Sequence, residues 1–478
     1  MTKDMNFLMI LPELFVLGMT CIVLLVDLYV KQKRHFVTYA LTQLTLVGAL
    51  VISICLFHVS DGVYFHGLMI HDEIASILKI TIYVASFFVF MFSRDYLEQH
   101  DMPQGEFYLL GLFSIIGMMI AVSAHSFLTI YLGLELMSLP IYAMVALYRD
   151  NNKATEAAIK YFVLGAISSG MLLYGMSMIY GVTHSLDLAQ IATVLNSTMA
   201  HPTLISVLGV VFIVSGLAFK LGAVPFHMWI PDVYEGAPTA ATLFITVAPK
   251  VAAFGIVIRL LVDGMASLQV QWQDLLIILA VLSMLLGNVA AIAQTSIKRM
   301  LAYSTIAHGG YMLVGLAAAT PQGYASSMFY TITYALMSLG GFGMLTILSR
   351  KGIEVTNIQD LKGLNTRSPW LAFIMLVLLF SMAGMPPTVG FFAKVGIIEA
   401  AVGANLVWLA CVTMLIAVVG SYYYLRVVKV MYFEEPTTTT PISMAQDARL
   451  GISITGIATI ALGILPSALI TLCHGAFY

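Results

Sequence analysis

The sequence predicts an all-α polytopic membrane protein with about fourteen transmembrane helices. Of its 478 residues, 60% are hydrophobic and only 10% are charged, whereas soluble domains carry roughly 25% charged residues. The mean hydropathy is +0.95. Apolar runs of about twenty residues or more recur along almost the whole chain, and each can cross a hydrocarbon core about 30 Å thick. A soluble fold would have too little polar surface to enclose such a core.

Hydropathy sets the approximate limits of each span, and Gly, Pro and charged residues separate the spans. Because backbone groups cannot stay unpaired in lipid, runs of this length are expected to be helices. The first run carries Pro12-Glu13 and is longer than the apolar region of a cleavable signal. The predicted spans are residues 7–29, 36–58, 72–93, 107–124, 126–148, 157–181, 203–231, 238–262, 272–293, 300–319, 323–349, 370–400, 404–431 and 449–474.

Basic residues are distributed unevenly between the two sides of these spans. The odd-numbered connections, counted together with the ends of the spans beside them, hold 15 of the 22 Lys and Arg residues, whereas the even-numbered connections and the C-terminal tail hold none and the N-terminal tail holds only Lys3. The positive-inside rule therefore predicts that the odd connections are cytoplasmic and that both termini lie on the periplasmic side. The residues counted are Lys31, Lys33, Arg34, Arg94, Arg149, Lys153, Lys298, Arg299, Arg350, Lys351, Lys362, Arg367, Arg426, Lys429 and Arg449.

The remaining basic residues all fall within predicted spans, and they are Lys79, Lys160, Lys220, Lys250, Arg259 and Lys394. An ionisable residue at mid-bilayer costs at least about 2.5–3.5 kcal/mol, so its presence indicates a functional role. Lys220, Lys250 and Glu135 lie near the centres of their spans. A structural buried ion pair is the alternative, but several central lysines are hard to pair off. Lys79 and Arg259 lie off-centre and are expected to reach an interface by snorkelling.

Two of the predicted spans contain residues that break helices. Span seven has Gly222 and Pro225 directly after Lys220, and span twelve has Pro386-Pro387 shortly before Lys394. Proline removes a backbone donor and clashes with the preceding turn. Broken helices at membrane depth are tolerated inside protein or along a wet cavity, and their free ends form ion sites in transporters. Span eight has Pro249 directly before Lys250.

The two breaks occupy corresponding parts of the chain and suggest an internal repeat. We therefore predict a single transmembrane domain over residues 1–478, with helices 1–3 at about 7–93 and helix fourteen at about 449–474. Repeat one would cover about 107–262 and repeat two about 272–431. Each repeat has five helices, so the two copies would have inverted topology.

Three further residues are candidates for carrying protons. His227 and His308 have a near-neutral reference pKa, although a hydrogen-bonded buried histidine is an equally good interpretation. Lys160 follows Glu156 by four residues, which fits an ordinary pair on a helix face. A place for Lys160 on a proton path is the alternative.

No cofactor or metal site is expected on this chain. The four cysteines, Cys21, Cys55, Cys411 and Cys473, lie in apolar runs and form no CxxC pair, so an iron–sulfur or zinc site is not predicted. The sequence contains neither a Walker A loop nor a GxGxxG turn. Any nucleotide or electron carrier would therefore sit on other chains.

Three motifs resemble those of one membrane protein family. They are FKLGAVPFHMWIPDVYEGAPT at 219–239, SIKRMLAYSTIAHGGY at 296–311 and GMPPTVGFFAKV at 384–395. They are similar to subunit N of the proton-pumping NADH:quinone oxidoreductases (respiratory complex I), within the antiporter-like membrane subunits. Subunit L would carry a long C-terminal extension, and subunit M usually has Glu in place of Lys394. Mitochondrial versions lack the first three helices, so the resemblance is to bacterial proteins of the inner membrane.

The resemblance implies a role for each central residue. Glu135 and Lys220 would be the coupled pair on helices five and seven, with Lys250 as the connecting lysine on helix eight. Lys394 would be the terminal lysine on broken helix twelve. His227 and His308 would be polar links between them.

The resemblance also implies a proton-translocating subunit without redox chemistry of its own. NADH, FMN, iron–sulfur clusters and quinone would be bound by partner subunits. The expected partners are subunits M and K, the lateral helix of subunit L and the lipid bilayer, with no nucleic acid. When Glu135 moves away from Lys220, that lysine would give its proton to Lys250 and onward towards Lys394.

Two other functions compete with this one. A Mrp-like cation/proton antiporter subunit would use the same residues to bind or gate Na⁺ or K⁺. A passive scaffold would hold them as a structural line of charges.

Overall fold

The computed structural model describes residues 6–29, 36–59, 61–198, 203–349, 354–436, 442 and 444–478. Six basic residues of the topology prediction lie outside the described residues, namely Lys3, Lys31, Lys33, Arg34, Arg350 and Lys351. The chain forms two compact units. Unit 1 comprises Met1–Phe90, Pro103–Leu221 and Ala248–Leu275, and unit 2 comprises Met91–Met102, Gly222–Val247 and Leu276–Tyr478.

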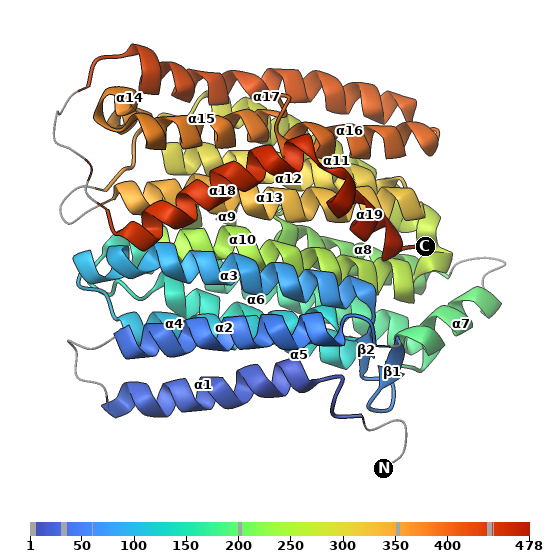
Figure 1. Cartoon of the computed structure of the whole chain (residues 1–478). Helices are drawn as coiled ribbons and strands as arrows, with labels where there is room; N and C mark the ends of the chain where they lie inside the picture. The colour runs from blue at the N-terminus through green and yellow to red at the C-terminus, as the bar shows by residue number, and fades with distance from the viewer. Residues whose placement is uncertain are drawn as a thin grey trace. The chain divides into compact units, whose positions relative to one another are not determined.

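Helices make up nearly all of the regular structure in both units (Figure 1). The helices of unit 1 are α1 (Leu11–Tyr29), α2 (Phe36–Leu56), α4 (Gln104–Val122), α5 (Phe127–Val145), α6 (Asn152–Thr183), α7 (Leu188–Thr198) and α8 (Leu204–Leu221). Three helices contribute residues to both units, namely α3 (Glu73–Gln99), α10 (Thr239–Val257) and α11 (Gln269–Ile292). A π-helical segment, Ile258–Gly264, extends α10, and a 3-10 turn, Ala266–Leu268, precedes α11.

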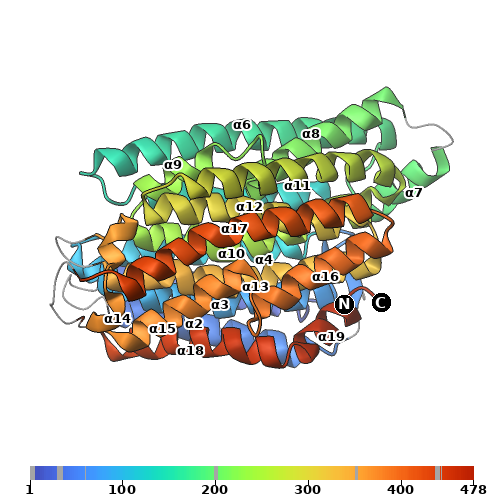
Figure 2. The same ribbon diagram turned by 90° about the horizontal axis from the view of Figure 1, so that it is seen from above.

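Unit 2 contains the remaining helices. They are α9 (Trp229–Gly236), α12 (Ile297–Ala317), α13 (Pro321–Leu348), α14 (Leu364–Arg367), α15 (Pro369–Ala383), α16 (Val389–Gly403), α17 (Val407–Phe433), α18 (Gln446–Ile464) and α19 (Ser467–Gly475). A 3-10 turn, Ile358–Leu361, lies before α14. Within this unit α13 packs against α12, α15, α16, α18 and α19 (Figure 2).

The predicted membrane spans are found as helices. Among the described residues, twelve helices have the length and hydropathy to cross a membrane. The other two predicted spans correspond to α12 and to the broken helix formed by α15 and α16. The α12 helix carries Lys298, Arg299 and His308, which lower its hydropathy, and its residues are almost all buried. The all-α polytopic fold with breaks in helices seven and twelve is therefore confirmed.

A short β-hairpin was not predicted. Strand β1 (Gly62–Tyr64) pairs antiparallel with β2 (Met69–His71) between α2 and α3. Phe65, His66 and Gly67 form the turn with positive φ angles of 56°, 55° and 88°. Two of these three residues have side chains that rarely adopt this conformation, so no turn signal in the sequence indicates the hairpin.

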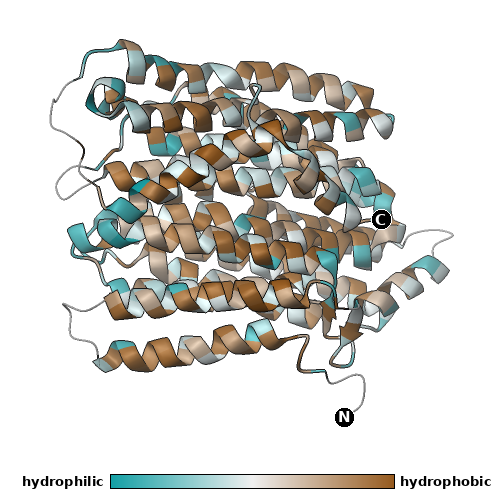
Figure 3. Cartoon of the chain, viewed as in Figure 1, coloured by the Kyte–Doolittle hydropathy of each residue, from teal (hydrophilic) through white to brown (hydrophobic). Residues whose placement is uncertain are grey.

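The surface of the helices is apolar, as expected for contact with lipid. On α17, Leu415 and Val418 are 69% and 68% exposed, and on α1 Leu25 is 56% exposed. Hydrophobic residues cover most of the length of α1 and α2 in Figure 3. Threonine and serine side chains are buried inside instead, such as Thr42 on α2. This distribution is the reverse of that in a soluble protein.

The prediction that Lys79 and Arg259 snorkel to an interface is wrong. Both side chains are buried inside unit 1, where the Lys79 ammonium lies 2.5 Å from a carboxylate oxygen of Glu13. Arg259 donates 2.7 Å bonds to both carboxylate oxygens of Asp72 and a 2.9 Å bond to Asp263. A buried charge needs a partner with good geometry, and tertiary packing supplies one in each case.

Candidate functional site

The first helix break lies directly after Lys220. Helix α8 ends at Leu221, Gly222 adopts a left-handed φ of 75°, and α9 begins only at Trp229. The last carbonyl groups of a helix have no partner within it. Here the Lys250 ammonium donates a 2.8 Å hydrogen bond to the carbonyl oxygen of Leu221 and a 3.3 Å bond to that of Lys220. A lysine on α10 thus caps the broken end of α8.

The second break has the same construction in unit 2. Helix α15 ends at Ala383, Gly384 has a left-handed φ of 84°, and α16 begins at Val389. The Lys394 ammonium donates a 2.8 Å hydrogen bond to the carbonyl oxygen of Ala383 and a 3.1 Å bond to that of Met382. A lysine from the following half-helix therefore caps the broken end of α15.

Both lysines are held by backbone carbonyl groups. Lys250 is 3% exposed and Lys394 is 8% exposed. The C-terminal end of a helix carries a partial negative charge, which stabilises a cation without supplying a full counter-charge.

Lys220 itself is placed against α5. Its ammonium donates a 3.0 Å hydrogen bond to the hydroxyl of Ser138 and a 3.5 Å bond to that of Tyr142. The predicted partner, Glu135, lies one turn before Ser138 on α5, but no ion pair within 4.0 Å joins it to Lys220 in the described structure. The Oε1 atom of Glu135 is buried without a hydrogen bond from any described residue. The Lys220 ammonium therefore contacts Ser138, whereas a direct contact with Glu135 was predicted.

His308 lies inside unit 2 and uses both ring nitrogens. Its Nδ1 is 2.6 Å from the hydroxyl of Tyr330 on α13, and its Nε2 is 3.1 Å from the hydroxyl of Tyr424 on α17. The ring of Tyr311, one turn further along α12, lies 5.0 Å from the ammonium of Lys394. The structure thus brings His308 and Lys394 into one cluster of tyrosines.

The other two candidates have different surroundings. His227 lies in the segment between α8 and α9, half-buried, and its Nδ1 has no hydrogen-bond partner among the described residues. Lys160 pairs with Glu156 on α6 at 2.8 Å, and these side chains are 42% and 65% exposed. The ion pair expected between Glu156 and Lys160 on one face of this helix is therefore present.

Sequence reasoning missed the hydroxyl groups that hold the charged side chains. Ser138 and Tyr142 contact Lys220, and Tyr330 and Tyr424 contact His308. A weak signal existed on α5, because Glu135, Ser138 and Tyr142 recur at spacings of three and four residues and so share one helix face. The tyrosines around His308 come from three helices, which no local pattern reveals.

No metal centre is found in the part of the chain that the structure describes: no three His, Cys, Asp or Glu side chains lie together in a way that would hold an ion. The four cysteines are free thiols. The side chains that this site brings together are amines, an imidazole, hydroxyls and one carboxylate, all of which exchange protons.

Comparison with known proteins identifies the family. A family model described as NADH:quinone oxidoreductase/Mrp antiporter, TM, matches residues 124–420. A protein of Thioalkalivibrio sulfidiphilus named NADH-quinone oxidoreductase subunit N is 53% identical over 98% of each chain. A protein of the same name from Coxiella burnetii is 54% identical over 99% of each chain.

The chain belongs to the NADH-quinone oxidoreductase subunit N family. Solved structures support the fold of this subunit N family member. A chain of respiratory complex I from Thermus thermophilus with bound aureothin has a TM-score of 0.83 and 28% identity, covering 96% of this chain and 98% of that one. A chain of the Mrp complex from Dietzia sp. DQ12-45-1b has a TM-score of 0.87 but only 19% identity, covering 99% of this chain and 97% of that one. The Mrp likeness shows the fold alone, so the sequence identity decides between the two families.

Proposed function

We propose that this chain translocates protons as a membrane subunit of a bacterial NADH:quinone oxidoreductase. Its membership of the subunit N family supports its place as a subunit of that complex. The single structural observation that carries the proton role is that Lys250 and Lys394 each cap the carbonyl end of a broken helix. Electron transfer from NADH to quinone would take place on partner subunits and supply the energy.

The first step of the proposed path lies in unit 1. Lys220 is held by the hydroxyls of Ser138 and Tyr142. Glu135 is one turn from Ser138, so a small side-chain movement would bring its carboxylate to the lysine and stabilise the protonated form. When Glu135 withdraws, Lys220 would release its proton to Lys250 once Lys250 is a neutral amine, and the Lys250 Nζ lies 3.3 Å from the backbone carbonyl oxygen of Lys220.

The second step lies in unit 2. The family resemblance assigns the next positions to His308 and Lys394, with His227 as a further link. His308 is bridged by hydroxyls on both sides, and a tyrosine hydroxyl can donate and accept a proton in turn. Lys394 would then pass the proton towards the periplasmic side.

The arrangement in the membrane completes the proposal. Both termini would lie on the periplasmic side, because the odd-numbered connections carry the basic residues. The two five-helix repeats would have inverted topology. The neighbours in the complex would be subunits M and K and the lateral helix of subunit L. Reporter fusions should read periplasmic at both termini and cytoplasmic at residue 150.

The substitution Lys220→Arg tests the proton role. Arginine keeps the positive charge and can contact Ser138 and Glu135, but it does not give up its proton at physiological pH. We expect the complex to assemble and to lose most proton pumping, measured as NADH-driven acidification of inverted membrane vesicles per NADH oxidised. Glu135→Ala should have the same effect. The loss of pumping in the double variant should be far smaller than the sum of the losses in the two single variants. Wild-type pumping by Lys220→Arg would contradict the proposal.

A further inference from the structure

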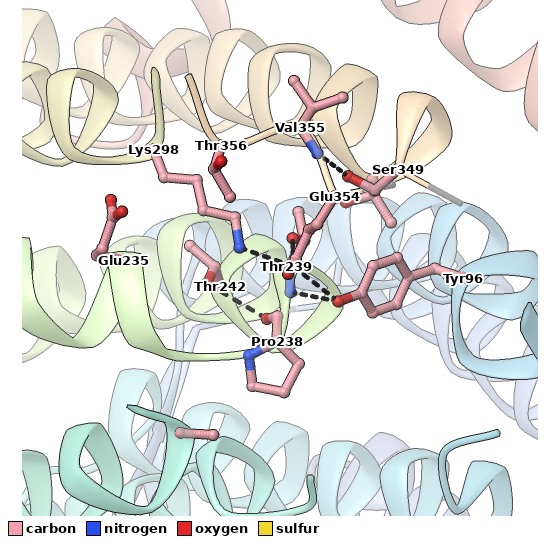
Figure 4. Close-up of polar contacts among 12 residues, drawn as sticks. Tyr96, Glu235, Pro238, Thr239, Thr242, Lys298, Ser349, Glu354, Val355 and Thr356 are labelled. Atoms are coloured by element: carbon pink, nitrogen blue, oxygen red, sulfur yellow. Dashed lines mark hydrogen bonds and ion pairs between the residues drawn. The ribbon is translucent and has the colours of Figure 1, made fainter. Parts of the chain in front are cut away.

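A second cluster of polar side chains lies at the end of α10 that carries Thr239, wholly within unit 2. The Glu354 carboxylate accepts a 3.0 Å hydrogen bond from the Lys298 ammonium, a 2.8 Å bond from the Thr239 hydroxyl and a 3.1 Å bond from the Tyr96 hydroxyl (Figure 4). The Tyr96 hydroxyl in turn accepts a 3.2 Å bond from the backbone N–H of Thr239. Three helices distant in the sequence, α3, α10 and α12, therefore meet at one carboxylate.

This cluster joins a buried interior to the surface. Lys298 has 2% of its side chain exposed, and Thr239 is fully buried, whereas the Glu354 side chain is 37% exposed. A small open pocket lined by Asp95, Tyr96 and Ser349, among others, reaches the tyrosine. The basic residues of the adjoining connections place this end of the unit on the cytoplasmic side by the positive-inside rule.

Helix α10 carries hydroxyl groups on one face only. Its serine and threonine residues are Thr239, Thr242 and Thr246, and its one charged residue is Lys250. At about 100° per residue these four positions fall within an arc of about 80°, and they span about 16 Å along the axis. All three threonines are fully buried. A helix meant only to fill the core would not need its polar groups aligned.

Successive hydroxyls on this face are close enough to relay a proton. A separation of three or four residues corresponds to a rise of about 4.5–6 Å, which one water molecule can bridge. Thr242 donates to the carbonyl of Tyr234, and Thr246 donates to that of Leu243. Each hydroxyl oxygen still has an acceptor lone pair, so it can take one proton and release its own.

We propose that Glu354 is the cytoplasmic proton-uptake group of this subunit, and that the Thr239–Thr242–Thr246 face of α10 conducts protons from it to Lys250. This inference rests on the proposed function, which makes Lys250 a proton carrier. Glu354 takes a proton from water and becomes a neutral acid. It then gives that proton to the Thr239 hydroxyl while the chain of hydroxyls and waters delivers one proton to a neutral Lys250 amine, which can reload Lys220 when Glu135 moves back to that lysine. Glu354 returns to its carboxylate form, Lys250 becomes an ammonium, and the hydroxyl groups and waters between them keep their charge.

Lys298 is a positioning residue in this scheme. Its ammonium holds the carboxylate of Glu354 against the end of α10. Tyr96 and Thr239 supply the other contacts, so these three groups face Glu354 from α12, α3 and α10. A purely structural clamp would use the same contacts, but it would not require hydroxyls further along α10.

The test compares variants of the whole complex in inverted vesicles, with pumping normalised to NADH oxidation and assembly checked by native electrophoresis. Thr246→Val removes one relay hydroxyl, and Glu354→Gln removes the uptake group. Thr459→Val is the matched control for the first, because Thr459 is equally buried and bonds its own helix at 2.8 Å. Glu434→Gln is the control for the second, because Glu434 forms a 3.3 Å ion pair with Lys362.

We expect Thr246→Val and Glu354→Gln to lose as much pumping as Lys250→Ala, and both controls to pump as wild type. Thr246→Ser should restore pumping, because it returns the hydroxyl. Pumping by Glu354→Gln should recover as the pH is lowered from about 8 to about 6, because direct protonation from water becomes easier. Pumping by the wild type should change little over this range. If Lys250→Ala fails but Thr246→Val and Glu354→Gln pump normally, the uptake route is wrong and the proposed function stands. If Lys250→Ala itself pumps normally, the proposed role of Lys250 is wrong.

Discussion

The ammonium of Lys394 lies 2.8 Å from the carbonyl oxygen of Ala383, the last residue of α15. Lys250 stands at the same distance from the carbonyl oxygen of Leu221, the last residue of α8. In both places a break in a helix leaves carbonyl groups without partners, and a lysine supplies the missing donor. The helix break and the buried charge therefore stabilise each other. The substitution of either lysine has two consequences, because it removes a charge and orphans two carbonyl groups.

Lys394→Ala should reduce pumping and also lower the stability of unit 2. A buried carbonyl that loses its hydrogen bond costs about 1–3 kcal/mol. We expect the complex to assemble at reduced thermal stability, with pumping per assembled complex strongly decreased. Full pumping at normal assembly would reduce Lys394 to a structural role.

Gly384→Ala should disturb the same lysine without changing a charge. Gly384 has a φ of 84°, and an added Cβ would lie 2.7 Å from Cδ of Lys394. The variant should lose pumping and stability, since the backbone is strained and the lysine is displaced. Gly170→Ala on α6 is the control, because nothing lies within 4 Å of its added Cβ. Equal behaviour of the two variants in pumping and thermal unfolding would argue against the prediction.

Ser138→Ala should uncouple Glu135 from Lys220. The hydroxyl of Ser138 accepts from Lys220 at 3.0 Å and donates to the carbonyl of Leu134 at 2.7 Å. Its loss leaves Lys220 with one weaker contact and should lower pumping by less than Lys220→Ala does. Ser138→Thr keeps the hydroxyl and should retain activity. Pumping by Ser138→Ala equal to wild type would show that Ser138 only fills space.

Glu354 should make the stability of unit 2 fall at acidic pH. Burial acts to raise the pKa of this carboxyl group, but the Lys298 ammonium and three hydrogen bonds outweigh it and hold the pKa below its usual value of 4.5. A depressed carboxyl pKa stabilises the fold above the unfolded value, and this stabilisation is lost as pH falls through the folded pKa. The thermal unfolding temperature of the purified complex should therefore decline below about pH 4.5. In Glu354→Gln this acid-dependent decline should be smaller, and an identical decline would contradict the assignment.

Arg259→Ala should destabilise unit 1 rather than interrupt proton transfer. Arg259 is 1% exposed and binds Asp72 and Asp263, with a further 3.0 Å bond to the carbonyl of Val122. Removing one member of a buried ion pair typically costs about 3–5 kcal/mol. We expect poor assembly, with normal pumping per assembled complex. Asp72→Asn keeps most of the shape and should be milder. Normal assembly with lost pumping would place Arg259 on the proton path instead.

The sequence by itself determined the membrane fold, the approximate spans and the two breaks. Apolar runs of membrane length leave only helices as a spanning structure. The prolines at Pro225 and Pro386-Pro387 stop those helices wherever they lie in the fold, because the missing N–H and the steric clash are local. The identity and order of the central charged residues could also be predicted, because a charged residue inside an apolar segment is recognised from the local sequence alone.

Only the tertiary structure decided what each charge contacts. Lys250 and Leu221 are far apart in sequence, as are His308 and Tyr424, and no periodicity links them. The position of Arg259 in a predicted span says nothing of Asp72, which lies just before α3, so the sequence predicts snorkelling where the structure has an ion pair. Glu135 and Lys220 were expected to pair directly, but Ser138 occupies the position beside the lysine. Partners of buried polar groups depend on how helices pack, and packing joins side chains that the chain itself keeps apart.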